Sequence, residues 1–283
     1  MVECKSLSFR YTHKSPLFEN LNLSLSPGHM VGLLGKNGAG KTTLLKLMAG
    51  FLKPQAGYVS INQLAPFDRS LAFLDQIAFV PEDFKLPDIS IRDLSAKYGV
   101  FYSKFDASLF KILISKFDLD PTLRLRHISF GQGKKAFLAF AIALQPSILF
   151  LDEPTNALDI PAKQMLRTML LEHLPEQSLA IISTHQVREI SNLVSQVAIL
   201  DQGRMILNLD IATISTKISM SHTQNIPNNA HILFSEPALG GHLILTQRNS
   251  GPETEIDLEL LFKAVSANPD IFQNLYSEEA CHA

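Results

Sequence analysis

The sequence predicts an α/β fold built around a mainly parallel β-sheet. Segments typical of strands and of helices alternate through about residues 1–205, which is the order expected when helices connect parallel strands. Three runs, at residues 30–34, 147–152 and 179–184, are apolar enough to be buried strands, and polar residues follow each of them. Because ligands usually bind at the carboxyl ends of such strands, we expect the functional site at that edge of the sheet.

Two regions depart from this alternation. Between about residues 83 and 131, apolar residues recur at helical spacing, which predicts a helical insertion. After residue 205, we expect a small α+β appendage over residues 206–283. It would contain strands in HILFS and LILTQ, a turn at RNSG and an amphipathic helix in IDLELLFKAV, joined through the polar residues 219–229.

Composition and charge narrow the class of protein. The 283 residues are 46% apolar and 18% charged, which is typical of a globular protein. Because 25 Lys and Arg face 27 Asp and Glu, with no long basic run, we expect no direct nucleic-acid partner. The longest apolar runs, such as residues 136–144, are shorter than the roughly 20 residues of a membrane-spanning helix, so we expect no such helix. The cysteines, Cys4 and Cys281, favour a reducing, cytoplasmic setting over a disulfide framework.

Residues 35–43 read GKNGAGKTT and contain the phosphate-binding pattern G-x-x-x-x-G-K-[ST] between an apolar strand and a helical pattern. Backbone N–H groups of the loop and of the helix start would face the phosphates, Lys41 would reach the terminal phosphates, and Thr42 would ligate Mg²⁺. A glycine-rich turn with a solvated lysine is the alternative. The predicted nucleotide-binding residues of the loop are Gly35, Asn37, Gly38, Ala39, Gly40, Lys41, Thr42 and Thr43.

Two adjacent carboxylates, Asp152 and Glu153, follow a buried strand. Like charges that leave a core strand repel each other and lose hydration, so a compensating cation is expected. Mg²⁺ on a nucleotide supplies it, with Asp152 as its ligand and Glu153 as the base or positioner of the attacking water. His185 follows another buried strand and could meet the γ-phosphate. The alternatives are an acidic pair that caps a helix and a histidine with a structural role.

In the order and spacing of these motifs, the chain resembles the ATP-binding subunits of ABC transporters over about residues 1–205. The resemblance implies a P-loop NTPase (RecA-like) core with an antiparallel β subdomain, a Walker A loop at residues 35–43 and a Walker B strand that ends in the catalytic Glu153. It also identifies Tyr11 with the aromatic residue that stacks on adenine, Asp159 with the D-loop and His185 with the switch histidine. On its own, Tyr11 would be interpreted as an ordinary strand aromatic.

The family signature L-S-G-G-Q corresponds here to Ile128, Ser129, Phe130, Gly131 and Gln132. In the family, this segment begins a helix and contacts the γ-phosphate bound to the opposite subunit, so that ATP lies between two subunits arranged head to tail. Phe130 replaces a glycine. It either packs on a neighbour or, if the position requires a positive φ, strains the site.

The Q-loop glutamine of the family is replaced by Glu82, in FVPEDF. A glutamate still offers an oxygen to Mg²⁺ or to water, although it adds negative charge beside a triphosphate. The implied metal ligands are therefore Thr42, Asp152 and Glu82. This form resembles bacterial ABC-2 or exporter-type subunits, and the alternative is an exposed turn residue.

These features together predict an ATPase subunit, peripheral on the inner face of the cell membrane, that energises transport through a separate permease. ATP and Mg²⁺ are the implied cofactors. The implied partners are the permease and a second ATPase subunit, identical or different. We expect residues 83–102 to contact the permease, although Ile89, Ile91 and Phe101 would suit a core equally well.

Two other functions stay open. A soluble ATPase of the same superfamily could act on nucleic acid or ribosomes, but the single ATPase domain and slight acidity argue against it. A nucleotide-dependent regulatory module without turnover is the other alternative, and the complete set of Lys41, Asp152, Glu153 and His185 argues against it.

Overall fold

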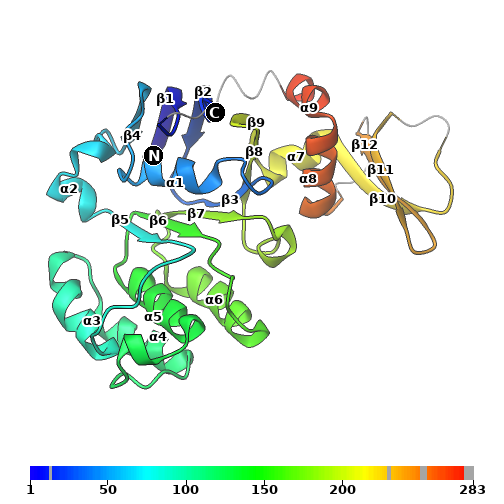
Figure 1. Cartoon of the computed structure of the whole chain (residues 1–283). Helices are drawn as coiled ribbons and strands as arrows, with labels where there is room; N and C mark the ends of the chain where they lie inside the picture. The colour runs from blue at the N-terminus through cyan, green and yellow to red at the C-terminus, as the bar shows by residue number, and fades with distance from the viewer. Residues whose placement is uncertain (13–14, 228–230, 249–253, 277–283) are drawn as a thin grey trace.

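The computed structural model describes the whole chain except residues 13–14, 228–230, 249–253 and 277–283. In this part, a central six-stranded sheet lies between a small antiparallel sheet and a group of helices, and a second small sheet extends to one side (Figure 1). Cys281 and most of the expected RNSG turn fall outside the described residues. The α/β fold predicted from the sequence is confirmed.

The central sheet has the strand order β5-β6-β7-β3-β8-β9. All its strands run parallel except β9, which pairs antiparallel with β8 at the edge. The strands are β3 (Met30–Leu34), β5 (Ile77–Val80), β6 (Ile148–Asp152), β7 (Leu179–Thr184), β8 (Gln196–Asp201) and β9 (Arg204–Asp210). Helices and sheet cover both faces of the middle strands, which explains their continuous apolar runs.

The N-terminal sheet is the expected antiparallel β subdomain, with the order β2-β1-β4. Its strands are β1 (Val2–Phe9), β2 (Phe18–Leu25) and β4 (Ala56–Ile61), and the short helix α2 (Leu71–Leu74) follows them. Helix α1 (Lys41–Met48) fills the space between this sheet and the central one. Their apolar side chains form one hydrophobic core, to which the central strand β6 contributes Ile148 and Phe150.

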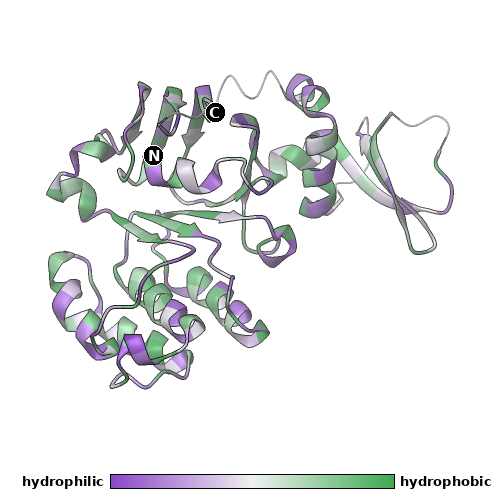
Figure 2. Cartoon of the chain, in the orientation of Figure 1, coloured by the Kyte–Doolittle hydropathy of each residue, from purple (hydrophilic) through white to green (hydrophobic). Residues whose placement is uncertain are grey.

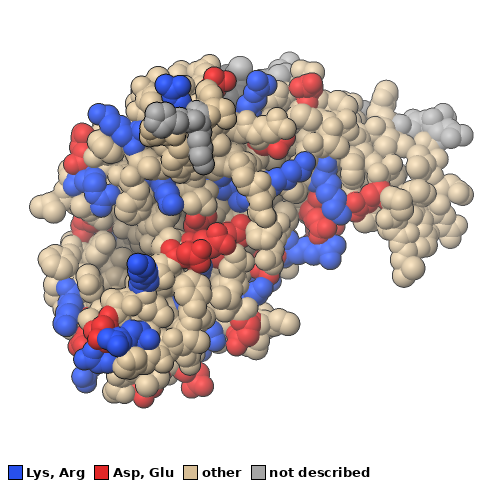
Figure 3. Space-filling model, in the orientation of Figure 1, with Lys and Arg blue, Asp and Glu red and all other residues tan. Residues whose placement is uncertain are grey.

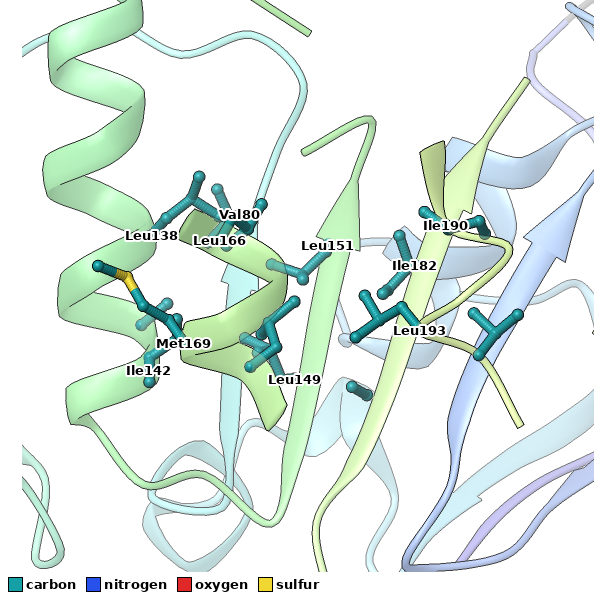
Figure 4. Packing of buried hydrophobic residues seen from close by; sticks show 14 of the residues in the cluster. Val80, Leu138, Ile142, Leu149, Leu151, Leu166, Met169, Ile182, Ile190 and Leu193 are labelled. Carbon is teal, nitrogen blue, oxygen red and sulfur yellow. The ribbon is translucent and has the colours of Figure 1, made fainter. Parts of the chain in front are cut away.

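Helices on the opposite face of the central sheet form the second core. They are α3 (Ile91–Tyr98), α4 (Ala107–Lys116), α5 (Phe130–Ala143) and α6 (Ile160–His173). Leu149 and Leu151 of β6 face this core because side chains alternate along a strand. Figure 4 shows how they pack against Leu138 and Ile142 of α5 and Leu166 and Met169 of α6. In Figure 2 the central strands are predominantly hydrophobic, whereas the helices carry hydrophobic and hydrophilic residues.

The C-terminal elements form a three-stranded antiparallel sheet with helices beside it, as expected for residues 206–283. The strands are β10 (Ile218–Thr223), β11 (Ile232–Ala238) and β12 (Gly241–Gln247), in the order β10-β12-β11, and the helices are α7 (Ile211–Lys217), α8 (Leu258–Ala267) and α9 (Pro269–Leu275). The prediction of a polar linker from residue 219 is wrong up to residue 223, because β10 pairs with β12 and Met220 lies opposite Leu245. Since β9 crosses residue 205, the division into two domains there remains a prediction.

Candidate nucleotide-binding site

A cleft of about 410 Å³ opens at the carboxyl edge of the central sheet, beside the loop that follows β3. It is lined by Tyr11, Ser15, Pro16, Leu17, Asn37, Gly38, Gly40, Lys41, Thr42, Thr43, Glu82 and Glu153. The structure therefore brings together the glycine-rich loop, the aromatic Tyr11 in the loop after β1 and two of the predicted carboxylates, Glu82 and Glu153. Gly35 and Ala39 do not line the cleft and are buried beneath the loop.

The loop wraps around the ammonium group of Lys41. Helix α1 begins directly after Gly40, whose φ of 108° turns the chain into the helix. Nζ of the buried Lys41 donates to the carbonyl oxygens of Gly35 at 2.7 Å and Lys36 at 3.3 Å. Burial lowers the pKa of Lys41, and the nearby carboxylates oppose that shift. The ammonium thus lies at the floor of the cleft, where a bound phosphate could replace the carbonyl acceptors.

Asp152 ends strand β6 with its carboxylate almost fully buried. Oδ1 of Asp152 accepts hydrogen bonds from Oγ1 of Thr42 at 3.0 Å and Oγ of Ser183 at 2.5 Å. The hydroxyl of Thr42, at the start of α1, and the carboxylate at the end of β6 are thereby adjacent. These are oxygen ligands of the type that Mg²⁺ takes together with phosphate oxygens, so the residues fit that ion.

Glu153 follows in an uncommon backbone conformation, with φ of 44°. Glu153 is 5% exposed, and within the described part of the chain the hydrogen bonds to its carboxylate come from the end of β7. Oε1 accepts from the backbone N–H of His185 at 3.0 Å and from its Nδ1 at 2.8 Å, and Oε2 accepts from Oγ1 of Thr184 at 3.0 Å. A strained residue persists only where its surroundings determine its conformation, so the orientation of this carboxylate is set by its neighbours.

Glu82 is half-buried at the cleft, and its carboxylate is hydrogen-bonded to the first of two linked side-chain amides. Oε1 of Glu82 accepts from Nδ2 of Asn156 at 2.8 Å, and Oδ1 of Asn156 accepts from Nε2 of Gln186 at 3.4 Å. Three segments that follow β5, β6 and β7 are therefore linked. The alternative of an exposed turn residue at Glu82 is wrong, because the residue is half-buried and its carboxylate accepts from Asn156.

The signature segment forms the N-terminus of α5 and does not line this cleft. Ser129 is the N-cap: its Oγ accepts from the N–H of Gln132, and Oε1 of Gln132 accepts from the N–H of Ser129. Phe130 is the first helical residue and has no positive φ, so the strained alternative fails. Its ring packs instead on Phe84, with centroids 5.1 Å apart, and Phe84 packs on Phe137.

The D-loop lies against the same helix. A Cβ added to Gly131 would lie 2.6 Å from the carbonyl oxygen of Ala157, so a glycine is needed at this contact. Asp159 caps α6 by accepting from the N–H of Ala162 at 3.0 Å. It also lies 3.5 Å from Nζ of Lys135 on α5. The D-loop thus joins the first turns of α5 and α6.

Tyr11 stands at the rim of the cleft, with 40% of its surface exposed. Its hydroxyl lies 3.1 Å from Oγ1 of Thr43, and its ring makes an edge contact with Phe9 at a centroid distance of 5.0 Å. An exposed aromatic surface is therefore fixed beside the phosphate loop.

Lys134 is a residue of the site that the sequence analysis missed. It is 0% exposed, and its Nζ donates to carbonyl oxygens in the segments of Glu82 and Glu153. The signal was present in the sequence: Lys134 precedes Leu138 by four residues and Ala141 by seven, which places it on the buried face of the helix.

Comparison with known proteins agrees with this geometry. The family model for ABC transporters matches residues 18–156, which include the phosphate loop, the signature and both carboxylates. The chain contains an ABC transporter nucleotide-binding domain. The chain is accordingly an ATP-binding protein and an ATPase.

Relatives and solved structures support the family assignment. A putative ABC transporter ATP-binding protein of Methanosarcina acetivorans is 28% identical, and the match covers 89% of this chain and 96% of that protein. The energy-coupling factor transporter ATP-binding protein EcfA2 of Methanospirillum hungatei is 31% identical over 73% of this chain, which spans about half (54%) of that relative. A solved ATP-binding subunit of an ABC transporter superposes with a TM-score of 0.70 at 26% identity, over 76% of this chain and 92% of that one. Within the described ranges, no helix combines the length and the apolar character needed to cross a membrane.

Proposed function

We propose that this chain is the ATP-hydrolysing subunit of an ABC transporter and energises transport through a separate membrane permease, peripheral to the inner face of the membrane. The observation that carries the proposal is the placement of Glu153. Glu153 lines the same cleft as Lys41 and Thr42. Hydrogen bonds with the side chains of Thr184 and His185 hold its carboxylate in place. The names of the similar proteins, which include a transporter ATP-binding protein, support the transport role.

The phosphate end of ATP would lie on the loop of residues 35–43. Lys41 and the N–H groups at the start of α1 bind the phosphates, because the helix end and the ammonium both carry positive charge. Thr42 and Asp152, with an oxygen of Glu82, would hold Mg²⁺. When bound, the ion neutralises charge on the phosphates that transfer. Tyr11 would stack its exposed face on adenine.

Glu153 would orient the attacking water and accept its proton. His185 holds the glutamate through two contacts, and its side chain is partly exposed. His185 does not line the cleft of the single subunit, and its ring would contact the γ-phosphate once ATP is bound. Asp159 and the signature lie outside the cleft. Ser129, Phe130, Gly131 and Gln132 at the N-terminus of α5 would therefore serve ATP held by a second subunit, in a head-to-tail dimer.

The permease would contact the helical insertion. Val100 and Phe101 are exposed (76% and 75%), and Tyr98 beside them is partly exposed, whereas Ile91 is in the core. Apolar side chains clustered on a surface favour contact with another protein. The rival nucleic-acid function lacks support, because Lys and Arg side chains on the face shown in Figure 3 are interspersed with acidic ones and form no continuous stripe.

Co-expression with the polytopic membrane protein encoded nearest to this chain tests the proposal. The two proteins should copurify, and the complex in lipid vesicles should release phosphate from Mg·ATP faster than the chain alone. Phe101→Glu should abolish copurification, whereas Ile112→Glu, an exposed position on α4, should not. Failure to copurify with any neighbouring membrane protein contradicts the transport role, and equal phosphate release by wild type and Glu153→Gln supports the regulatory alternative.

A further inference from the structure

Lys134 places a cation in the interior of the protein, directly behind the catalytic edge of the sheet. Its Nζ donates to the carbonyl oxygens of Glu153 at 3.0 Å, Glu82 at 3.0 Å and Pro81 at 3.4 Å. These acceptors belong to the backbone after β5 and β6, not to carboxylate side chains. One ammonium on α5 thus holds both segments from which Glu82 and Glu153 reach the cleft.

The burial of this lysine calls for an explanation other than stability. Removing an ammonium from water is unfavourable, and an apolar side chain of similar size often stabilises a core as well or better. The pKa of Lys134 is lowered by burial, and the carboxylates of Glu82, Asp152, Asp83 and Glu153 oppose the shift. The ammonium differs from an apolar side chain because it donates hydrogen bonds in fixed directions. With an apolar residue at this position, the buried carbonyl groups would lose these donors.

Two glycines that precede Lys134 in the first turn of α5 bring the helix against the same two segments. A Cβ on Gly131 would lie 2.6 Å from the carbonyl oxygen of Ala157, in the segment after Glu153. A Cβ on Gly133 would lie 2.4 Å from a methyl group of Leu86, in the segment after Glu82. Glycine is unfavourable inside a helix, and the close approach of both segments accounts for it here. The signature helix is thereby fixed between the two catalytic segments.

We propose that Lys134 is a positioning residue for ATP hydrolysis: it fixes the backbone that carries Glu153 and Glu82 and couples that backbone to the signature helix. This inference rests on the proposed role of Glu153. Glu153 has a left-handed backbone, its N–H donates to the carbonyl oxygen of Ser183 at 3.0 Å, and its own carbonyl is held by Lys134. The peptide groups on both sides of this residue are therefore restrained. A displacement of α5 on dimer contact would move the glutamate with it.

The first test compares Lys134→Met with Lys111→Met, an exposed lysine of α4, in the full chain. Since a displacement of about 1 Å can cost on the order of a hundredfold in rate, Lys134→Met should lower kcat for phosphate release at least about tenfold. The KM and Kd for ATP should stay within about twofold, because Lys134 holds the reacting carboxylate and not the phosphates. Lys134→Gln, which keeps a donor, should have an intermediate kcat and guards against poor folding of the methionine variant.

The inference would be overturned if both Lys134 variants had a kcat within about twofold of that of Lys111→Met. That result would leave ATP hydrolysis itself established. An equal loss of ATP affinity and of kcat would also overturn it, because that is the result of general distortion. If wild type hydrolyses no faster than Glu153→Gln, the proposed function fails, and hydrogen exchange then decides the positioning role. Peptides that contain Glu82 and Glu153 should exchange faster in Lys134→Met than in Lys111→Met, and unchanged exchange would contradict it.

Discussion

Nδ1 of His185 lies 2.8 Å from Oε1 of Glu153, and the backbone N–H of His185 donates to the same oxygen at 3.0 Å. The histidine therefore orients the glutamate through its backbone and its ring together. Since Glu153 also accepts from Thr184, its carboxylate has little freedom to turn away from the cleft. Orientation of a base toward its water is a large contribution to hydrolysis, so this contact should affect rate more than binding.

Replacing His185 by alanine removes the ring contact and leaves the backbone contact. We expect kcat for ATP hydrolysis to fall about tenfold to a hundredfold, with the Kd for ATP nearly unchanged. Phosphate release and calorimetric titration measure the two quantities. The control is His173→Ala, because His173 lies at the end of α6 beside Lys116, away from the cleft. An unchanged kcat in His185→Ala would show that the backbone contact alone is sufficient.

Tyr11 should contribute to binding and not to turnover. Stacking of a base on an aromatic ring contributes about 1–3 kcal/mol, so Tyr11→Ala should raise the Kd for ATP roughly fivefold to a hundredfold. Tyr11→Phe keeps the ring and loses only the contact with Thr43, so its Kd should stay close to that of wild type. If the alanine variant binds ATP as well as wild type does, the ring serves only to pack against Phe9.

Phe130 should stabilise the fold although it departs from the family signature. Phe130→Gly removes the ring contact with Phe84 and places a glycine at the start of α5, so the free energy of unfolding should fall by about 2 kcal/mol. Urea denaturation measures this change. Phe101→Ala is the control, because Phe101 is largely exposed and should change stability by less than about 0.5 kcal/mol. A glycine variant as stable as wild type would mean that the aromatic contact has no energetic importance.

Asp75 should give a pH-dependent contribution to stability. Hydrogen bonds from the hydroxyl and the backbone N–H of Ser103 hold the pKa of this carboxyl below its ordinary value of 3.8. The stabilisation is therefore present above that pH and is lost as the pH falls through the lowered pKa of the folded state. Asp75→Ala should be about 1 kcal/mol less stable than wild type at pH 7, and the difference should disappear in strong acid. A difference that is equal at pH 7 and pH 2 would contradict this explanation.

The sequence was sufficient to predict that the candidate carboxylates and His185 lie together, because each stands at the carboxyl end of a buried strand. Asp152 at the end of β6, Glu153 directly after it and His185 after β7 had to lie together once the strands were parallel neighbours. The phosphate loop is local and has its own pattern, so it too was predictable. Ser219–Thr223 were not, because their polar composition hides a strand that is formed by pairing with β12, distant in the sequence.

Contacts between distant segments could not be derived in this way. The ring of Phe130 packs on Phe84, which lies 46 residues earlier in the chain. The sequence alone could not distinguish this packing from a strained backbone at Phe130, because it does not show where Phe84 lies. Lys134 stands beside Lys135 in the sequence, yet Lys134 is buried and Lys135 pairs with Asp159. Helical spacing indicates which lysine faces inward. Only the fold shows that this lysine donates hydrogen bonds to the carbonyl oxygens of Glu82 and Glu153.

The most direct test of this account is phosphate release from Mg·ATP by wild type and by Glu153→Gln, with the Kd for ATP measured on both. Glutamine keeps the size of the side chain and removes the base, which contributes about 10²–10⁴-fold in such reactions. We expect both proteins to bind ATP with similar affinity and wild type to release phosphate at least about a hundredfold faster. Equal rates at equal affinity would contradict the assignment of Glu153 as the residue that drives hydrolysis.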